Sequence, residues 1–391
     1  MIDYSKILSS TVTEIKPSGI RKFFDIAATM DAVISLGVGE PDFQTPWSVR
    51  KAGIASLEKG KTKYTSNSGL LELRQEISNY INRKCNIEYY PTSEIILSVG
   101  GSEAIDATLR AIITPGDEVI IPQPSYVCYE PITKLVGGVP VIIETLAEND
   151  FKVTPEQLKN AISEKTKALI LPYPCNPTGA IMEKADLEAI SKILRDTNIV
   201  VISDEIYSEL TFADSEHVSI ASIDGMRERT ILINGFSKAF SMTGWRLGFA
   251  CGPQEIISQI TKIHQFAIMC APTTAQYAAI EALRNCDEAV ADMKAEYNRR
   301  RRLIVDGFNK AGLTCREPKG AFYAFPCIKS TGLTSDEFCE RLLQEKHVAV
   351  VPGTAFGKGG EGFVRASYCY SPEHIAEALR RIDEFVKEIQ K

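Results

Sequence analysis

The sequence has no long hydrophobic run, and this absence sets the first limit on its function. No stretch of the 391 residues approaches the ~20 consecutive apolar side chains that a membrane-spanning helix needs. The opening segment, MIDYSKILSSTVTEIKPSGIRKF, also lacks the apolar region of a secretory signal. We therefore expect no membrane partner and a cytoplasmic location.

The sequence also has no excess of positive charge and no closely spaced pair of cysteines. The chain carries 44 Lys and Arg residues against 50 Asp and Glu residues, a formal net charge of -6. It therefore has no basic field to hold a nucleic acid. Its ten cysteines are scattered without a C-x-x-C pair, which argues against a zinc knuckle or a dithiol redox centre. We expect most of them to be buried thiols in a reducing compartment.

The third absence is the glycine fingerprint of a dinucleotide-binding fold. The segment LGVGEP near Gly37 lacks the third glycine of G-x-G-x-x-G, and no such motif follows the strand that ends before Gly100. A dehydrogenase that depends on NAD is therefore disfavoured.

What the sequence does contain is a regular alternation between residues 94 and 251. Short β-branched runs, separated by amphipathic stretches, read EIILSV, DEVIIP, VPVIIE, KALILP, NIVVIS, RTILIN and WRLGFACG. This pattern predicts an α/β fold in which helices cover both faces of a mainly parallel sheet. Thr154 and Gln157 form a capping-box pattern around Pro155 and predict the start of one helix.

The pattern changes after Asn285. DEAVADMKAEYNRRRRLIVDGFNKAG predicts one long helix, and the short strands GAFYAFP, HVAVVPG and GFVRASY follow it. We predict an N-terminal arm and part of a small domain in residues 1–46, a large cofactor-binding domain in 47–285 and a smaller α+β domain in 286–391. We interpret the four arginines at 299–302 as a solvated helix face.

Candidate site residues follow several predicted strands, at the edge where open α/β sheets bind ligands. Gly100 and Gly101 precede a helix opening at Ser102, which suits a phosphate but also a plain tight connection. Tyr126, after IPQPS, suits either a flat ligand ring or the core. Asn176, in PYPCNPTG, either projects its amide into a site or simply belongs to a turn.

Asp204 ends the apolar strand of VVISDEIYSEL, and Tyr207 follows three residues later. A carboxylate at the end of a buried strand needs compensation for its lost hydration, so Asp204 predicts a positive group nearby. The alternative is an aspartate that caps a helix.

Lys238 stands at the end of another apolar strand, in INGFSKAFSMTGWRLGF. Burial near fixed cations lowers the pKa of a lysine and makes its amine a nucleophile that forms a Schiff base with an aldehyde. Arg246 and Ser237, with the helix start at Gly101 and Glu103 in its first turn, would then hold a phosphate. Taken alone, Lys238 is better explained as a snorkelling surface lysine, and only the joint pattern favours the site.

Pyridoxal 5'-phosphate is the cofactor that uses all these groups together. It has an aldehyde for Lys238, a pyridine nitrogen whose proton Asp204 would maintain, and a phosphate for the cations. Its phenolic oxygen suits Asn176 and Tyr207, and its ring face suits Tyr126.

These motifs resemble those of the class I/II aminotransferases of pyridoxal-phosphate fold type I. GFSKAFSMTGWRLGF is similar to their lysine motif, NPTG and SDEIY to their other cofactor motifs, and LGVGEPDFQTP to their substrate loop. The resemblance covers nearly the whole chain and implies a large domain with a mainly parallel seven-stranded sheet. It also implies a homodimer.

The resemblance assigns further residues. It implies that Tyr64, in KYTSNSGL, reaches the phosphate in the partner's active site, and that Gly39 contacts substrate through its backbone. Arg365, in GFVRASY, would bind the substrate α-carboxylate as a bidentate fork, with Tyr126 and Asn176 also at the substrate.

SGIRKFFDIA, LPYPCNPTG and SDEIYSEL most resemble the branch of aromatic-amino-acid, aspartate and N-acetyl-diaminopimelate aminotransferases. Many aspartate-specific members have tryptophan where this chain has Tyr126, and we identify no basic residue for a dicarboxylate side chain. We predict transfer of an amino group from an L-amino acid, aromatic or of broad range, to a 2-oxo acid such as 2-oxoglutarate. The chemistry would be ping-pong, with Lys238 as base and acid.

Two other functions stay open. A carbon–sulfur β-lyase would use the same lysine, aspartate and phosphate groups. A ligand-sensing regulator would need a DNA-binding region, and the sequence has neither a basic region nor room for a helix-turn-helix ahead of Gly37.

Overall fold

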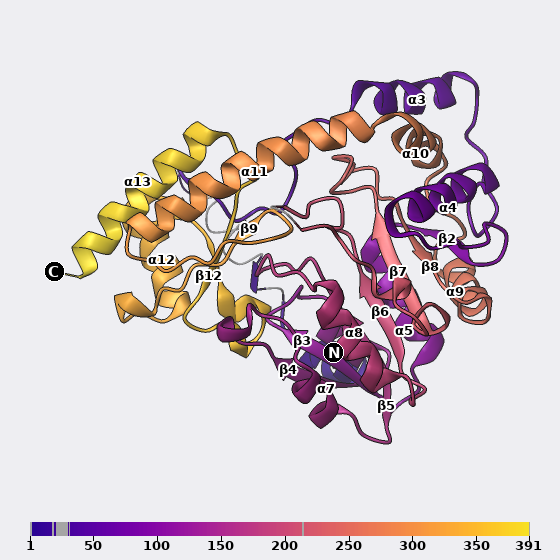
Figure 1. Ribbon diagram of the computed structural model, residues 1–391, viewed down its shortest axis with the longest axis horizontal. Coiled ribbons are helices and arrows are strands. Elements are labelled where there is room, and N and C mark those ends of the chain that lie inside the picture. Colours follow the sequence, from indigo (N-terminus) through magenta and orange to yellow (C-terminus); the bar gives the residue numbers. More distant parts are fainter. Residues whose placement is uncertain (1, 18, 21–29, 31, 213–214, 391) are drawn as a thin grey trace.

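A seven-stranded sheet forms the centre of the computed structural model, which describes residues 2–17, 19–20, 30, 32–212 and 215–390 (Figure 1). In spatial order its strands are β2 (Ile95–Ser98), β8 (Gly248–Cys251), β7 (Thr230–Gly235), β6 (Val200–Asp204), β5 (Thr166–Leu171), β3 (Glu118–Gln123) and β4 (Val139–Glu144). Only β8 is antiparallel to its neighbours in this sheet. The predicted mainly parallel α/β sheet is confirmed, and each of the seven apolar runs contains one strand.

Helices cover both faces of the sheet because side chains alternate along each strand. Ile96 of β2 packs into the core on one face, whereas Ile95 and Leu97 enter the opposite core. The first face is covered by α5 (Gly101–Ile112), α6 (Tyr129–Leu135) and α9 (Gln254–Ala267). The second is covered by α3 (Trp47–Glu58), α4 (Leu71–Cys85), α7 (Pro155–Ala161), α8 (Lys184–Leu194) and α10 (Thr273–Asn285).

The predicted capping box opens α7. The Thr154 hydroxyl accepts from the backbone N–H of Gln157 at 3.2 Å, and the Gln157 side chain accepts from the Thr154 N–H at 3.1 Å. Two otherwise unpaired N–H groups are thereby satisfied, which fixes where the helix begins.

The C-terminal third builds a separate core on three helices, α11 (Asp287–Lys310), α12 (Ser335–Lys346) and α13 (Pro372–Ile389). Figure 1 shows α11 and α13 side by side. Two small sheets complete this part: β1 (Ile34–Ser35) with β10 (Val348–Ala349), and β9 (Tyr323–Ala324) with β11 (Val351–Pro352) and β12 (Val364–Ser367). The parallel β1–β10 pair joins the N-terminal segment to the C-terminal third.

The four-arginine run of α11 is only half solvated, so our interpretation of it was wrong. Arg299 is exposed, but Arg300 and Arg301 are 7% and 2% exposed. Arg300 pairs with Asp42 at 2.8 Å, and Arg301 pairs with Glu317 at 2.6 Å. Two consecutive positions of a helix point about 100° apart, so a run of four like residues spans both its buried and exposed sides.

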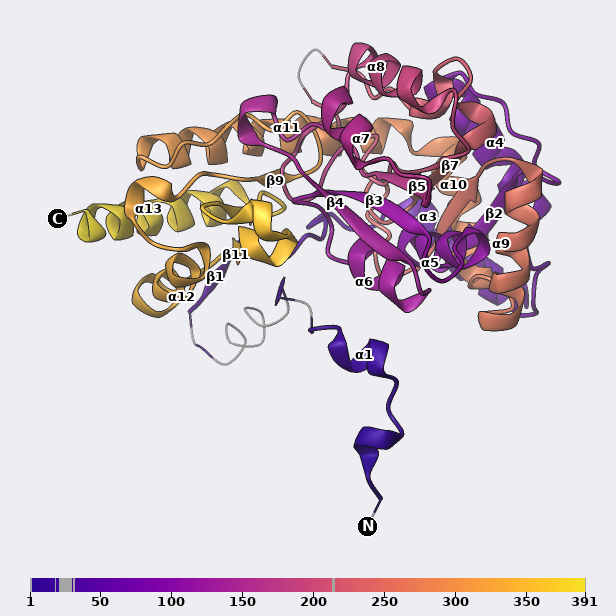
Figure 2. The same cartoon turned by 90° about the horizontal axis from the view of Figure 1, so that it is seen from below.

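The N-terminal segment projects from the body of the molecule (Figure 2). It contains α1 (Ser10–Glu14) and exposes large apolar side chains, including Ile2, Tyr4, Ile7 and Leu8. Most of the SGIRKFFDIA motif lies outside the described residues.

Cysteines and helix lengths complete the comparison with the sequence. All ten cysteines are free and six are buried, as predicted for most of them. Among the residues described, no helix is long and apolar enough to cross a membrane.

Candidate active site

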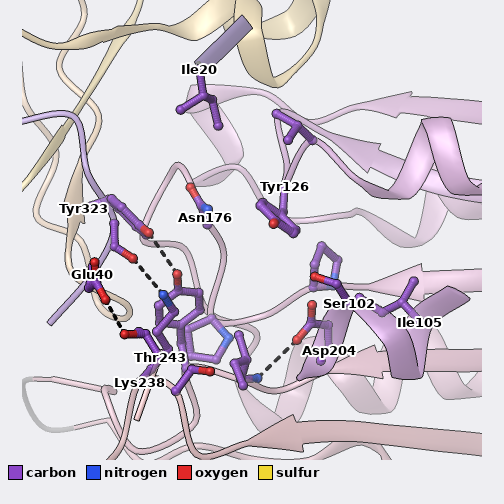
Figure 3. A pocket seen from close by; sticks show the side chains of 18 of the residues that line it. Ile20, Glu40, Ser102, Ile105, Tyr126, Asn176, Asp204, Lys238, Thr243 and Tyr323 are labelled. Atoms are coloured by element: carbon purple, nitrogen blue, oxygen red, sulfur yellow. Dashed lines mark hydrogen bonds between the residues drawn. The ribbon is translucent and has the colours of Figure 1, made fainter. Parts of the chain in front are cut away.

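A cavity of about 550 Å³ opens at the carboxyl ends of the parallel strands. The sheet contributes its floor, and the N-terminal segment together with β9 and β12 of the C-terminal third contributes the opposite wall (Figure 3). The cavity brings together eleven of the thirteen predicted site residues: Gly39, Gly101, Ser102, Tyr126, Asn176, Asp204, Tyr207, Ser237, Lys238, Arg246 and Arg365. Glu103 and Tyr64 are the two that do not line it.

Lys238 follows β7 and extends its amine across the cavity. Its Nζ donates to the backbone oxygen of Gly39 at 2.7 Å and lies 5.8 and 5.5 Å from the ring centres of Tyr207 and Phe322. Burial of the amine lowers the pKa of Lys238 to about 8. Near neutral pH this amine is therefore far more often unprotonated than a surface lysine, as its predicted nucleophilic role requires.

Asp204 ends β6 and is 7% exposed. The Tyr129 hydroxyl donates to its Oδ2 at 2.7 Å, and the Ile206 N–H donates to its Oδ1 at 3.2 Å. Burial raises the pKa of Asp204, while these two hydrogen bonds act in the opposite direction. The expected cation is not in contact with it: among the described residues both partners are neutral donors. A buried carboxylate with neutral partners leaves room for a cationic ligand.

Arg246 lies against the glycine turn that begins α5. A Cβ placed on Gly100, whose φ is +79°, would meet Arg246 Nη2 at 2.6 Å. Arg246 itself has a φ of +52°, and its Nη1 donates to the Thr243 oxygen at 3.0 Å. Glycine is therefore needed at position 100 both for its backbone conformation and for the approach of the guanidinium.

Arg365 of β12 is 2% exposed and sandwiched between the rings of Tyr323 and Phe356, at 4.4 and 4.8 Å. Its Nη1 donates to Asn176 Oδ1 at 2.9 Å, and its Nη2 donates to the Gly37 oxygen at 2.5 Å. Its Nε has no partner within the described part of the chain. This buried cation therefore has N–H groups left for an anionic ligand.

Glu103 and Tyr64 depart from the predicted cluster. The Glu103 carboxylate turns back from the cavity, because Oε2 accepts from the Val99 N–H at 2.5 Å and Oε1 bonds His264 Nδ1 at 2.6 Å. Its side chain therefore does not line the cavity, although its N–H belongs to the first turn of α5. Tyr64 is 81% exposed, so it does not pack within its own chain.

The sequence interpretation missed several lining residues. The Tyr323 hydroxyl bonds the Tyr207 hydroxyl at 2.9 Å, and Thr243 donates to Glu40 beside Lys238 (Figure 3). Tyr323 had no distinguishing signal, since GAFYAFP is also an ordinary core strand. Tyr129 stands only three residues after Tyr126, so both lie near the same edge of the sheet. This short spacing could have identified Tyr129 as a lining residue.

Comparison with known proteins places this fold among the pyridoxal-phosphate-dependent enzymes. The crystal structure of an aromatic aminotransferase from Pyrococcus horikoshii matches with a TM-score of 0.90 and 45% identity, over 95% of this chain and 99% of that chain. The model of the family "Aminotransferase class I and II" matches residues 31–382, and the chain belongs to this family. It is a pyridoxal-phosphate-dependent aminotransferase.

Its relatives differ in the substrates their names give. The chain is 48% identical to an aspartate aminotransferase of Pyrococcus abyssi, over 97% of this chain and 98% of the relative. It is 43% identical to aromatic-amino-acid aminotransferase 2 of Thermococcus litoralis, over the same shares of the two chains. The predicted branch of the family is thus confirmed, whereas the substrate is not determined by it.

The residues present fit pyridoxal phosphate. The volume of about 550 Å³ lies within the ~300–1,000 Å³ typical of small-molecule sites. Asp204 has no cation of its own, which suits a protonated ring nitrogen, and the glycine turn beside Arg246 suits a phosphate.

Proposed function

We propose that this enzyme transfers the amino group of an L-amino acid, aromatic or of broad range, to 2-oxoglutarate in a ping-pong reaction. The observation that carries the proposal is the amine of Lys238, whose pKa is lowered to about 8 in a cavity that also contains Asp204 and Arg365. An amine, a carboxylate and a carboxylate-binding cation at one site are what this chemistry requires.

Bound pyridoxal phosphate supplies an aldehyde that captures amines and a protonated ring that withdraws electrons from the substrate Cα. Lys238 would hold the cofactor through its amine, and as base and acid the same amine would move a proton between the substrate Cα and C4' of the cofactor. Asp204 would hold the proton on the ring nitrogen, and the hydrogen bonds from Tyr129 and Ile206 favour its ionised form against the effect of burial. Asn176 and Tyr207 would orient the ring through its phenolic oxygen.

The other residues would bind two anionic groups, the phosphate of the cofactor and the α-carboxylate of the substrate. Arg246, Ser237 and Ser102, with the first-turn N–H groups of α5, would bind the phosphate, and Tyr126 would stack on the ring. Arg365 would bind the substrate α-carboxylate through Nε and the free hydrogens of its Nη atoms, with the Gly39 backbone beside it.

The preference for an aromatic or broad range of donors rests on the remaining lining. The cations that line the cavity within the described residues are Lys238, Arg246 and Arg365, and each has a role above. Ile20, Val38 and Val127 add apolar surface. An apolar donor side chain therefore has a complementary surface in this part of the lining.

The assembly we propose is a homodimer with shared active sites, in which Tyr64 reaches the partner's phosphate. Large apolar side chains are exposed on α3, on the Tyr64 loop and in the last turn of α9, namely Trp47 (61%), Leu57 (54%), Tyr64 (81%) and Phe266 (87%). Apolar side chains gathered on one surface are typical of an interface.

We also propose the domain division at residues 46 and 285 and a cytoplasmic location. The short break between α10 and α11 at Cys286, and the separate core of the C-terminal third, support the division. The ten free cysteines support a reducing compartment.

A donor panel tests the function. With 2-oxoglutarate as acceptor, we expect glutamate to form from phenylalanine or tyrosine at least as fast as from aspartate. Turnover of aspartate alone would refute the proposed donor preference. Pyruvate and ammonia released from cysteine-type substrates without any acceptor would instead identify a β-lyase.

The attachment of the cofactor has its own test. Borohydride reduction of the holoenzyme followed by peptide mapping should place the pyridoxyl group on Lys238, and a label on another lysine would overturn the mechanism.

A further inference from the structure

Glu103 closes a small loop around the start of α5. Its Oε2 accepts from the N–H of Val99, the last residue before Gly100, at 2.5 Å. The enclosed residues are the glycine turn that faces Arg246. The carboxylate therefore ties the end of the strand segment to the first turn of the helix, and so fixes the N–H groups between them.

His264 holds the other oxygen of this carboxylate. It belongs to α9, is 1% exposed, and its Nδ1 lies 2.6 Å from Glu103 Oε1. A carboxylate only accepts hydrogen bonds, so Nδ1 carries the proton and donates it. Nε2 of the same ring is buried without a partner in the described part of the chain. The polar contact of this imidazole is therefore directed to Glu103.

We propose that the Glu103–His264 pair is a positioning device for the phosphate of the cofactor. The inference rests on the proposed role of the α5 start as the phosphate site. A second anion so close to a bound phosphate would repel it, unless its charge were turned away and shared with a donor. The pair does both: the carboxylate is turned away from the cavity, and His264 donates to it.

His264 also connects this turn to the loop that carries Tyr64. The His264 carbonyl accepts from the N–H groups of Ile268 and Met269, at 2.8 and 3.1 Å. The Met269 carbonyl in turn accepts from Asn67 Nδ2 at 2.8 Å. The His264 side chain thus contacts the phosphate turn, whereas its backbone carbonyl contacts the segment that bonds the Tyr64 loop, so a side-chain substitution leaves these backbone acceptors in place.

The chain provides a matched control at the other end of β2. Glu94 accepts the N–H of Tyr90, four residues before it, at 2.8 Å and pairs with Arg227 at 2.8 Å. Glu103 makes the same two kinds of contact, to the N–H four residues before it and to one basic side chain. Glu94 differs in the segment it encloses: none of residues 90–94 lines the cavity, whereas Gly101 and Ser102, between Val99 and Glu103, do.

The experiment titrates the apoprotein with pyridoxal phosphate and, separately, with pyridoxal, which lacks the phosphate. For Glu103→Ala and His264→Leu we expect the Kd for pyridoxal phosphate to rise about tenfold, as for the loss of one charge-assisted hydrogen bond. The Kd for pyridoxal should change less than twofold. Glu103→Gln and His264→Asn, which keep hydrogen-bonding groups, should restore much of the affinity, and Glu94→Ala should leave the ratio of the two Kd values unchanged.

The variant Arg246→Gln distinguishes a failure of this inference from a failure of the proposed phosphate site. If Arg246→Gln fails to weaken phosphate-dependent binding, the assignment of the phosphate site is wrong. If Arg246→Gln weakens it but the Glu103 and His264 variants do not, or weaken both ligands equally, the pair is merely structural and the inference is overturned. Should the alanine and leucine variants not fold, the same two titrations on Glu103→Asp decide, because the shorter carboxylate reaches less far toward Val99 and His264: an unchanged ratio of the two Kd values overturns the inference and a raised ratio supports it.

Discussion

Gly39 lies so close to Tyr323 that a side chain at position 39 would overlap with its hydroxyl group. A Cβ at this position would lie 1.9 Å from the hydroxyl of Tyr323, a residue 1% exposed that has little room to move. We expect Gly39→Ala to displace Tyr323 and to lower kcat/KM by about tenfold or more, because small displacements at a reacting centre cost that much. Gly244→Ala is the control, since a Cβ there meets nothing within 4 Å. Equal kcat/KM values for the two variants would contradict the expectation.

The pKa of Lys238 predicts how cofactor attachment depends on pH. Only the unprotonated amine adds to an aldehyde, and its fraction rises as the pH increases through about 8 rather than through the ordinary value of 10.5. The rate of pyridoxal-phosphate attachment to apoprotein should therefore rise about tenfold per pH unit below 8 and level off above it. Stopped-flow absorbance between pH 6 and 10 measures this. A midpoint near 10.5 would show that the amine is solvated.

Asp204→Asn isolates the charge of Asp204 from its structural role. An asparagine oxygen can still accept the Ile206 N–H, so the turn after β6 is preserved, but a neutral amide cannot hold a proton on the ring nitrogen. We expect the variant to keep bound cofactor and to lose about a hundredfold or more in kcat, the usual cost of removing one electrostatic partner. Near-normal turnover would mean that Asp204 serves only the turn.

The clustering of several site residues at one edge of the sheet was predictable from their positions relative to the strands. Lys238 and Asp204 follow apolar runs whose parallel strands end at one edge of the sheet, and Arg246 precedes β8, whose antiparallel direction puts its start at the same edge. The direction in which the Glu103 side chain turns was not predictable, because it depends on His264, 161 residues away. The same holds for Asp204, whose Tyr129 partner comes from α6.

At the scale of the element, α11 offers a direct comparison inside its arginine run. Arg301 donates to the Pro318 oxygen at 3.1 Å and lies 5.6 Å from the ring of Phe212, whereas Arg299 is 80% exposed. We expect Arg301→Met to lower the free energy of unfolding by about 2 kcal/mol or more, since a buried charge network is broken. Arg299→Met should change it by no more than about 0.5 kcal/mol. Urea unfolding measures both, and similar values would restore the interpretation of a solvated face.

Strands were easier to predict than their arrangement. Each apolar run bounded by turn residues predicted its strand closely, because a strand buried on both faces needs continuous apolar residues. Their order in the sheet, and the reversal of β8, depend on pairing between distant segments, which no local pattern encodes. The interpretation of the arginine run was wrong for a related reason. Charge alone does not show which face of the helix contacts Asp42 or Glu317.

At the scale of the whole molecule, shared active sites predict complementation between two inactive variants. Mixed Lys238→Ala and Tyr64→Ala chains form heterodimers in which, if Tyr64 acts across the interface, one site carries both lesions and the other carries neither. Random exchange should then restore about a quarter of the wild-type activity, because half of the dimers are mixed and each has one intact site. Activity is measured before and after proven subunit exchange. No recovery would mean that each chain completes its own site.

The wall of the cavity formed by the two chain ends also has a consequence for how the protein is made. Gly37 and Arg365, joined by a hydrogen bond, are 328 residues apart, and β1 pairs with β10 over a similar separation. At a translation rate of roughly 5–20 residues per second, the first strand leaves the ribosome tens of seconds before its partner. The last strand of the central sheet to be synthesised, β8, ends at Cys251. All seven strands are therefore present in the nascent chain well before β10. This wall of the cavity is therefore assembled last, after nearly the entire chain has been synthesised.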